Sequence, residues 1–253
     1  DSVLAQTRRD FELIVVDDGS GDETRSVLKA YGSRIRVLEQ ANRGVSAARN
    51  LGIRAARGNL LAFLDADDLW QPEKLARQVA FFDRRPGALI CQTEEIWIRR
   101  GVRVNPRRRH RKPSGDIFEA SLALCLVSPS AVMLRRELFD TVGFFDEHLP
   151  ACEDYDLWLR VSARHPVHLI DAPLVIKRGG HADQLSQQPG LDRYRIQSLA
   201  KILDSGILTP KQTSAAAAVL QEKCRIYAAG CHKRGRVEEA LAYTHLAERH
   251  VQL

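Results

Sequence analysis

Two apolar runs in the first half of the chain end abruptly in acidic residues. The first, FELIVVDDGS (11–20), leads into a segment with helical spacing (22–32), and the second, NLLAFLDADD (59–68), leads into another (71–86). Runs rich in β-branched residues are typical of strands buried on both faces, and strands that alternate with helices predict an open α/β sheet. Because ligands of such sheets bind at the carboxyl ends of the strands, the acidic clusters mark the expected binding edge.

Further periodic segments continue this pattern before the chain becomes purely helical. Strands are expected at 35–40, 88–98 and 130–138, the last running into a helix, and helices are expected at 44–58 and 153–166. From Leu191 only helical spacing remains, and the helix pair around KRGRVEEA resembles one tetratricopeptide unit. Since one such unit cannot form a solenoid, we expect it to pack against the main domain or a second subunit. The expected domains are therefore 1–190 and 191–253.

The composition excludes several classes of protein. With 44% hydrophobic and 28% charged residues, the 253-residue chain suits a globular protein with one substantial core. No run reaches the ~18 apolar residues of a membrane-spanning helix, and the N-terminus lacks the apolar centre of a signal peptide, so we expect a cytoplasmic protein. Five scattered cysteines without a C-x-x-C pair indicate reduced thiols, not disulfides or a cysteine zinc site.

The net charge of +6 is unevenly distributed, with an arginine-rich stretch, IRRGVRVNPRRRHRKPSG, that contains no acidic residue. A block of this kind is typical of a solvated surface loop. The alternative is that residues 99–112 bind an anionic partner, either a phosphorylated substrate or the inner face of a membrane through peripheral contact. Nucleic acid is not expected, because the stretch has no interleaved aromatic residues and no helix-turn-helix or finger pattern.

Three carboxylates follow the second apolar run: Asp65, Asp67 and Asp68. In a straight strand, neighbouring side chains point to opposite faces, so the three carboxylates could not all face one ligand. At the end of a strand the chain turns, and this restriction no longer applies. One acid could then contact a ligand hydroxyl while another binds a hard cation such as Mg²⁺ or Mn²⁺ through oxygen. The alternative is that Asp67 or Asp68 caps the helix that begins near Gln71.

The motifs VVDDGS, SAARN and LDADD, in this order, resemble those of the inverting family 2 nucleotide-sugar glycosyltransferases. The catalytic domain of that family has the GT-A fold, a Rossmann-like mixed sheet flanked by helices, and the resemblance covers residues 7–186. It implies that Asp17 and Asp18 lie at the nucleotide, with Asp18 on the base, and that Arg49 lies close by.

The same resemblance divides the work among the acids of LDADD. Asp65 matches the first acid of the family's D-x-D motif, which contacts the ribose, and Asp67 matches the metal-binding acid. Asp68 is a further metal candidate, because family members differ in how they use the third acid.

A transferase of this kind needs a carboxylate that deprotonates the acceptor hydroxyl. In LPACEDYDLWLRV, Glu153 and Asp154 match the family's ED motif at the start of a helix. The resemblance implies that Asp154 is the base and that Glu153 helps to position the acceptor. The alternative for Asp154 is an acid that only caps the helix or stabilises its first turn, and Asp156 is expected to be structural.

A basic segment, KRGGHADQLS, lies where related enzymes place a loop that closes over the diphosphate. Lys177 and Arg178 are candidates for neutralising the charge of the leaving group, and His181 is a candidate for binding the metal or the diphosphate. The alternative for His181 is a loop histidine without a ligand.

The start of the chain departs from the family pattern. Family members begin with a strand of the type V-S-V-I-I-P-x-Y-N and a helix that ends in LxSLLAQT, whereas this chain opens at DSVLAQT. The missing strand is central in the GT-A sheet and contributes nucleotide contacts. We therefore expect an N-terminally truncated GT-A domain.

The combined motifs predict a metal-dependent inverting hexosyltransferase with Mn²⁺ or Mg²⁺ as cofactor. Its expected donor is a nucleoside-diphosphate sugar, first of all a UDP-sugar, and its acceptor is a glycan, a lipid-linked sugar or a protein in the synthesis of cell-surface polysaccharide or glycolipid. The helical extension also leaves room for a homodimer. Two alternatives stay open: a catalytically inactive nucleotide-sugar-binding or scaffold protein, and a sugar nucleotidyltransferase, although the G-x-G-T-R-type loop of the latter is not visible.

Overall fold

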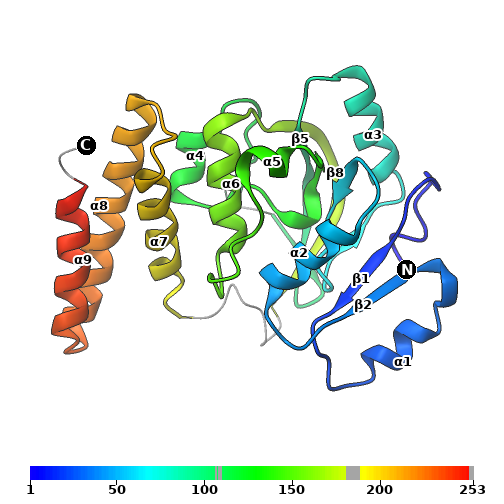
Figure 1. The fold of residues 1–253 in the computed structure, drawn as a ribbon, viewed down its shortest axis with the longest axis horizontal. Coiled ribbons are helices and arrows are strands. Elements are labelled where there is room, and N and C mark those ends of the chain that lie inside the picture. The colour runs from blue at the N-terminus through cyan, green and yellow to red at the C-terminus, as the bar shows by residue number, and fades with distance from the viewer. Residues whose placement is uncertain (106, 108–109, 181–188, 251–253) are drawn as a thin grey trace.

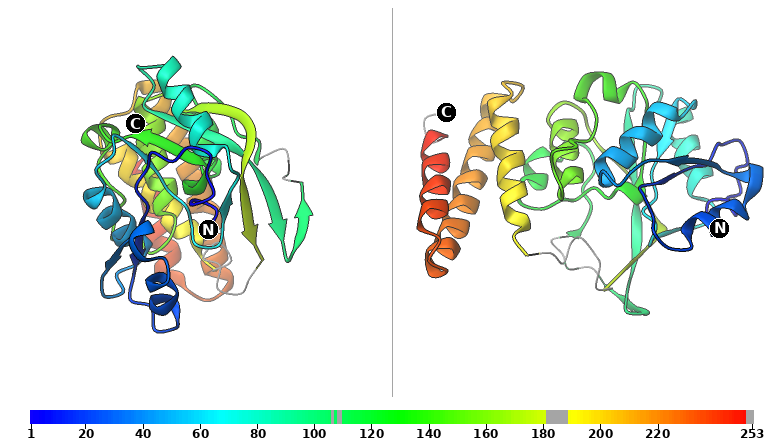
Figure 2. Two further views of the ribbon diagram at one scale, coloured as in Figure 1. Left: turned by 90° about the vertical axis from the view of Figure 1, so that its right-hand side faces the viewer. Right: turned by 60° about the horizontal axis from the view of Figure 1, so that its bottom comes forward.

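The computed structural model describes residues 1–105, 107, 110–180 and 189–250. The described strands are β1 (Ile14–Asp17), β2 (Arg36–Glu39), β3 (Leu60–Ala62), β4 (Leu69–Trp70), β5 (Ile90–Arg99), β6 (Val102–Val104), β7 (Val132–Arg135) and β8 (His168–Gly179). The described helices are α1 (Thr24–Lys29), α2 (Val45–Ala55), α3 (Lys74–Arg84), α4 (Phe118–Ala123), α5 (Leu138–Val142), α6 (Glu153–Arg164), α7 (Leu191–Asp204), α8 (Pro210–Lys233) and α9 (Val237–Arg249). The β1–β2 unit lies at one end of the molecule and α8 and α9 lie at the other (Figures 1 and 2).

The strands form two separate sheets. The larger sheet has the order β3-β7-β5-β8-β4, with β6 paired to β5, and it is mixed: β5 is parallel to β8, whereas β7 is antiparallel to both of its neighbours. The smaller sheet consists of β1 and β2 in parallel. The prediction of a mixed sheet flanked by helices is confirmed, and this arrangement is the GT-A fold.

Strand β1 is less buried than its sequence predicts. Although Ile14, Val15 and Val16 are β-branched, all three are only half-buried, and Asp17 is the one buried residue of the strand. The expectation of a strand buried on both faces is therefore wrong. The physical reason is that, in the described part of the chain, β1 pairs with β2 alone and its other side borders a cavity.

The C-terminal helices share a hydrophobic core with the α/β body. Tyr155 and Leu159 of α6 pack in one cluster with Leu199 of α7 and Leu220 of α8, and α4 contributes Phe118. Helix α8 begins with a capping box in which Thr209 and Gln212 satisfy each other's backbone donors, which fixes its start. Among the residues that the structure describes, no helix combines the length and the apolar character that a membrane crossing requires.

Most described residues of the arginine-rich stretch 99–112 are exposed, as the composition predicts, but the stretch is not a simple loop. A tight turn at Arg100 and Gly101, both with positive φ, reverses the chain so that β6 pairs with β5. The Lys112 side chain is buried beside Glu95, with 3.1 Å between Nζ and Oε1. This ion pair fixes the far end of the segment, because a buried ammonium requires a partner of opposite charge.

Candidate active site

The acids of LDADD lie in a turn between β3 and β4, where the chain leaves the sheet. The Asp68 amide donates to the Asp65 carbonyl (3.0 Å), which closes the turn, and the Asp65 amide donates to Ser130 Oγ (3.1 Å). Asp68 is buried and accepts a hydrogen bond from the Arg178 amide (2.9 Å), and Arg178 Nε donates to the Asp67 carbonyl. The turn thereby separates the environments of its three carboxylates.

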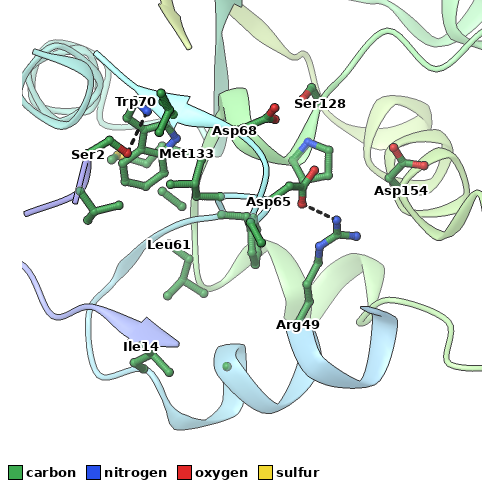
Figure 3. A pocket seen from close by; sticks show the side chains of 18 of the residues that line it. Ser2, Ile14, Arg49, Leu61, Asp65, Asp68, Trp70, Ser128, Met133 and Asp154 are labelled. Atoms are coloured by element: carbon green, nitrogen blue, oxygen red, sulfur yellow. Dashed lines mark hydrogen bonds and ion pairs between the residues drawn. The ribbon is translucent and has the colours of Figure 1, made fainter. Parts of the chain in front are cut away.

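Arg49 connects this turn with the start of α6. Its Nη2 lies 2.7 Å from Asp65 Oδ1 (Figure 3), and its Nη1 lies 2.6 Å from Glu153 Oε1, so one guanidinium bridges two carboxylates. Helix α2 is held in place by Asn50, whose side chain exchanges hydrogen bonds of 2.9 and 3.1 Å with the backbone of Phe145. Burial alone would lower the pKa of Arg49, but the carboxylates of Asp65 and Glu153 raise it.

Helix α6 places Glu153 and Asp154 in its first turn, where the helix dipole favours negative charge. The chain enters the helix through Cys152, which has a left-handed backbone conformation (φ 61°). Asp154 Oδ1 accepts from the Tyr155 amide (2.7 Å), and Asp154 Oδ2 accepts from the Cys125 thiol (3.6 Å). Burial, together with the neighbouring Asp154 carboxylate, raises the pKa of Glu153.

Lys177 of β8 lies among the acids of both segments. Its Nζ donates to Ser128 Oγ (3.3 Å). Burial alone would lower the pKa of Lys177, but the surrounding carboxylates, first Glu95 and then Asp68, Asp65 and Asp154, raise it. A protonated lysine therefore stands where negative charge converges.

The acids of VVDDGS do not reach this region. Asp17 accepts from the Ser20 amide (2.9 Å) and pairs with Arg25 (3.2 Å), and the hydrogen bonds from Ser20 lower its pKa. Asp18 accepts from Gln40 Nε2 (2.6 Å) and from the amides of Arg43 (2.9 Å) and Gly44 (2.8 Å), so it holds the loop after β2. Neither side chain lines the cavity described next.

A cavity of about 1720 Å³ extends from β1 across the site to the start of α7. The predicted site residues that line it are Arg49, Asp65, Asp67, Asp68, Glu153, Asp154, Lys177 and Arg178. Figure 3 shows Asp65 and Asp154 on either side of Arg49, and Ile14 and Leu61 at the apolar end. The structure thus brings eight of the predicted residues to one cavity, leaves Asp17 and Asp18 outside it, and does not describe His181.

Other residues line this cavity that sequence reasoning did not identify. Cys125 contacts Asp154, and Glu95, Trp97 and Lys112 form a hydrogen-bonded group on the wall beside Lys177. A single cysteine carries no pattern that would identify it. Trp97 and Lys112 stand in or beside the arginine-rich stretch, but only the fold shows that they face the site.

The carboxylates fit a divalent cation only together with a substrate. Within the described ranges, no group of three or more His, Cys, Asp or Glu side chains is arranged to hold a metal ion. Mg²⁺ and similar ions are often bound by one or two carboxylates plus substrate phosphates, and Asp67 on the cavity wall suits that mode. Asp68 is differently placed, since burial raises its pKa to about 6 and Arg178 occupies one of its oxygens.

Known proteins resemble this chain in both sequence and fold. The sequence profile described as glycosyl transferase family 2 matches residues 1–143. A UDP-Glc:α-D-GlcNAc-diphosphoundecaprenol β-1,3-glucosyltransferase of Escherichia coli, WfgD, is 31% identical over 179 residues, covering 70% of this chain and 68% of that protein. The chain spans between 28% and 59% of the length of five similar, uncharacterized glycosyltransferases of Rickettsia species.

Solved structures share the fold at lower sequence identity. Staphylococcus aureus TarS, in complex with UDP-GlcNAc, superposes with a TM-score of 0.69 at 19% identity, covering 88% of this chain and 66% of that one. The mannosyltransferase PcManGT from Pyrobaculum calidifontis, in complex with GDP-Man and Mn²⁺, gives a TM-score of 0.58 at 19% identity, covering 98% and 80%. With the matched profile and the geometry of the cavity, these likenesses lead to one conclusion: the chain belongs to glycosyltransferase family 2.

Proposed function

We propose that the chain catalyses inverting transfer of a hexose from a UDP-sugar to a hydroxyl of a lipid-linked sugar. The observation that carries the proposal is the Arg49 bridge, since it ties Asp65, the expected ribose contact, to Glu153, the neighbour of the expected base. A direct displacement needs one carboxylate that binds the sugar donor and another that acts as the base, both on the wall of one cavity. We propose UDP as the nucleotide because the name of WfgD specifies UDP-Glc and the TarS structure was solved with UDP-GlcNAc.

In the proposed reaction, the acceptor hydroxyl attacks the anomeric carbon of the donor. Asp154 takes the hydroxyl proton as the new carbon–oxygen bond forms, and the bond to the diphosphate oxygen breaks with its electron pair leaving on UDP. Because one displacement occurs and no enzyme nucleophile takes part, the anomeric configuration inverts. Lys177 and Arg178 lie on the cavity wall where their charges would favour the leaving diphosphate.

Asp67 is the residue we assign to a bound Mn²⁺ or Mg²⁺, with Asp68 supporting the turn beside it. When bound, the cation supplies positive charge that stabilises the departing diphosphate. The lipid-linked acceptor is proposed from the diphosphoundecaprenol acceptor in the name of WfgD, and it would bring the protein to a membrane surface.

The test compares the wild type with Asp154→Asn. UDP release is measured with UDP-Glc, Mn²⁺ and a GlcNAc-diphosphate lipid as acceptor, and the anomeric configuration of the product is read by NMR. We expect the variant to lose about 10²–10⁴-fold in turnover, the usual contribution of a general base, with UDP binding unchanged. Asp83→Asn, an exposed acid on α3, is the matched control and should behave as the wild type.

Three outcomes would contradict the proposal or part of it. Wild-type turnover in Asp154→Asn would remove Asp154 from its role as the base. UDP binding without turnover on any donor and acceptor would favour the alternative of an inactive binding or scaffold protein. Release of pyrophosphate when UTP and a hexose 1-phosphate replace UDP-Glc would indicate a nucleotidyltransferase.

A further inference from the structure

The paired strands β5 and β8 form one wall of the cavity beside the proposed catalytic group. Trp97 lies directly across from Lys177 in the parallel register of these strands. Because side chains alternate along a strand, Glu95, Trp97 and Arg99 share one face of β5. All three, with Lys177, line the cavity that also contains Asp154.

The indole of Trp97 is held in a fixed orientation on this wall. Its Nε1 donates to Glu95 Oε2 (3.0 Å), and Glu95 is itself fixed by the buried Lys112 (3.1 Å). The Arg99 guanidinium lies over the ring, 5.3 Å from its centroid, and His110 meets the ring in a T-shaped contact at 5.2 Å. A polar network thus positions an aromatic side chain that remains half-buried.

Trp97 differs in this respect from the other tryptophans. The chain has three tryptophans, and Trp70 and Trp158 are only 7% and 2% exposed, as core residues usually are. Trp97 instead borders a polar cavity, directly across from Lys177 on the neighbouring strand. A rigid, partly exposed indole on the wall of the cavity that Asp65 and Asp154 also line offers a flat apolar surface to a substrate bound there.

We propose that Trp97 is the platform on which the acceptor sugar stacks, and that Arg99 binds the phosphate that joins this sugar to its carrier. This inference rests on the proposed function and assigns its acceptor subsite. The apolar face of a pyranose ring packs on an aromatic ring, and a guanidinium matches the geometry of a phosphate with two parallel hydrogen bonds. An aromatic ring and a cation on one strand face therefore fit a sugar phosphate better than a neutral glycan.

Binding is tested first, independently of turnover. Acrylamide quenching of tryptophan fluorescence reports mainly on Trp97, because the other two tryptophans are buried. We expect GlcNAc-α-diphosphate undecyl ester to protect the fluorescence of the wild-type protein and to have no such effect on Trp97→Phe. Absence of protection in the wild type would overturn the platform. Equal protection by anionic vesicles without the sugar would overturn it in favour of a membrane contact.

Kinetics then separate the platform from the rest of the site. Trp97→Ala should raise the KM for the acceptor about tenfold, a typical cost of losing one aromatic stacking contact, while Trp97→Phe restores much of the loss. Arg99→Ala should raise the KM for the diphosphate acceptor but not for undecyl N-acetylglucosaminide, which lacks phosphate. Arg103→Ala, an exposed arginine of the same hairpin, is the control and should change neither value.

The two levels of the proposal fail in different ways. If calorimetry shows UDP binding and the assay shows transfer, but Trp97→Ala leaves the acceptor KM unchanged, the platform is wrong and the proposed function stands. If UDP does not bind, the proposed function fails, and the quenching experiment with the acceptor probe still decides on Trp97.

Discussion

Arg49 is the residue on which the geometry of the site most depends. Its side chain is 13% exposed and bridges Asp65 with Glu153, which is 8% exposed. Removing one member of a buried ion pair leaves the other charge without compensation, which typically costs about 3–5 kcal/mol. We expect Arg49→Ala to lower the free energy of unfolding by an amount of this order and to abolish UDP binding.

Arg49→Lys tests the fork geometry of the same residue. A single ammonium cannot reproduce two parallel contacts to different carboxylates, so the lysine should keep part of the stability but little of the UDP affinity. Urea unfolding and calorimetry measure the two effects, with Arg54→Lys, a half-exposed arginine on the same helix, as control. UDP affinity equal to the wild type in Arg49→Lys would show that the bridge does not shape the donor site.

The ion pair between Glu95 and Lys112 should make the stability of the protein depend on pH. Burial alone would raise the pKa of Glu95, but Lys112 and Lys177 outweigh it and lower the pKa to about 2 from an ordinary value of 4.5. For a carboxyl whose pKa is lower in the folded state, the stabilisation is present above pH 4.5 and is lost as the pH falls toward 2. A shift of this size corresponds to about 3 kcal/mol.

Glu95→Gln is the variant that checks this pH dependence. We expect it to be less stable than the wild type at pH 7, and the difference in the free energy of unfolding to shrink between pH 4.5 and pH 2. Urea titrations across this range measure it, and Glu119→Gln, a half-exposed acid on α4, should change little at any pH. A difference that stays constant down to pH 2 would mean that Glu95 does not act through its charge.

At the scale of elements, the start of α6 depends on an unusual backbone conformation. Cys152 has φ 61° and ψ 22°, a left-handed conformation that costs a residue with a Cβ roughly 1 kcal/mol. This conformation turns the chain so that Glu153 and Asp154 begin the helix at the cavity. Glycine should relieve the strain, whereas a β-branched residue should increase it.

We therefore expect Cys152→Gly to be at least as stable as the wild type and Cys152→Val to be less stable by about 1–2 kcal/mol. Thermal unfolding measures both variants. Ala30→Gly is the control, because Ala30 ends α1 at φ −65° and should lose stability as an ordinary Gly substitution does. Destabilisation of Cys152→Gly equal to that of Ala30→Gly would show that the left-handed conformation stores no strain.

The sequence predicts the elements better than their ends. Hydrophobic periodicity placed the strand of 59–68 correctly, but β3 ends at Ala62, and the DADD residues form a turn whose shape depends on Ser130 and Arg178. Arg49 meets carboxylates 16 and 104 positions away, and no local pattern encodes such distant contacts. Only the family resemblance brought these residues together before the structure did.

At the scale of the whole molecule, the separation of the two sheets is the feature that local pattern does not predict. Ile14 and Val16 of β1 and Leu61 of β3 line the same cavity from opposite sides (Figure 3 labels Ile14 and Leu61). Apolar β-branched residues that face a cavity are typical of a position between two strands. A further strand inserted there would join the sheets, and each half-buried side chain that it covers would add about 1 kcal/mol.

The last prediction is that a chain carrying a strand and a crossover helix upstream of Asp1 is more stable than the chain of 253 residues. A parallel strand beside β1 needs a crossover of a dozen or more residues, so the added unit must include the helix. We expect the melting temperature to rise by roughly 2–4 °C for each kcal/mol gained. UDP binding should strengthen as well, because the added strand would support β1 and the turn after β3.

The control carries the same unit with two prolines inside its strand, which removes the backbone donors needed for pairing but keeps the added length. If the strand occupies the cavity, only the unmodified unit raises the melting temperature, and Ile14→Asp, at a half-buried position of β1 that borders the cavity, should cancel the gain by placing a charge at the new interface. Equal melting temperatures and equal UDP binding in the extended protein and its proline control would contradict the idea, and would mean that the cavity beside β1 belongs to the working form of the protein.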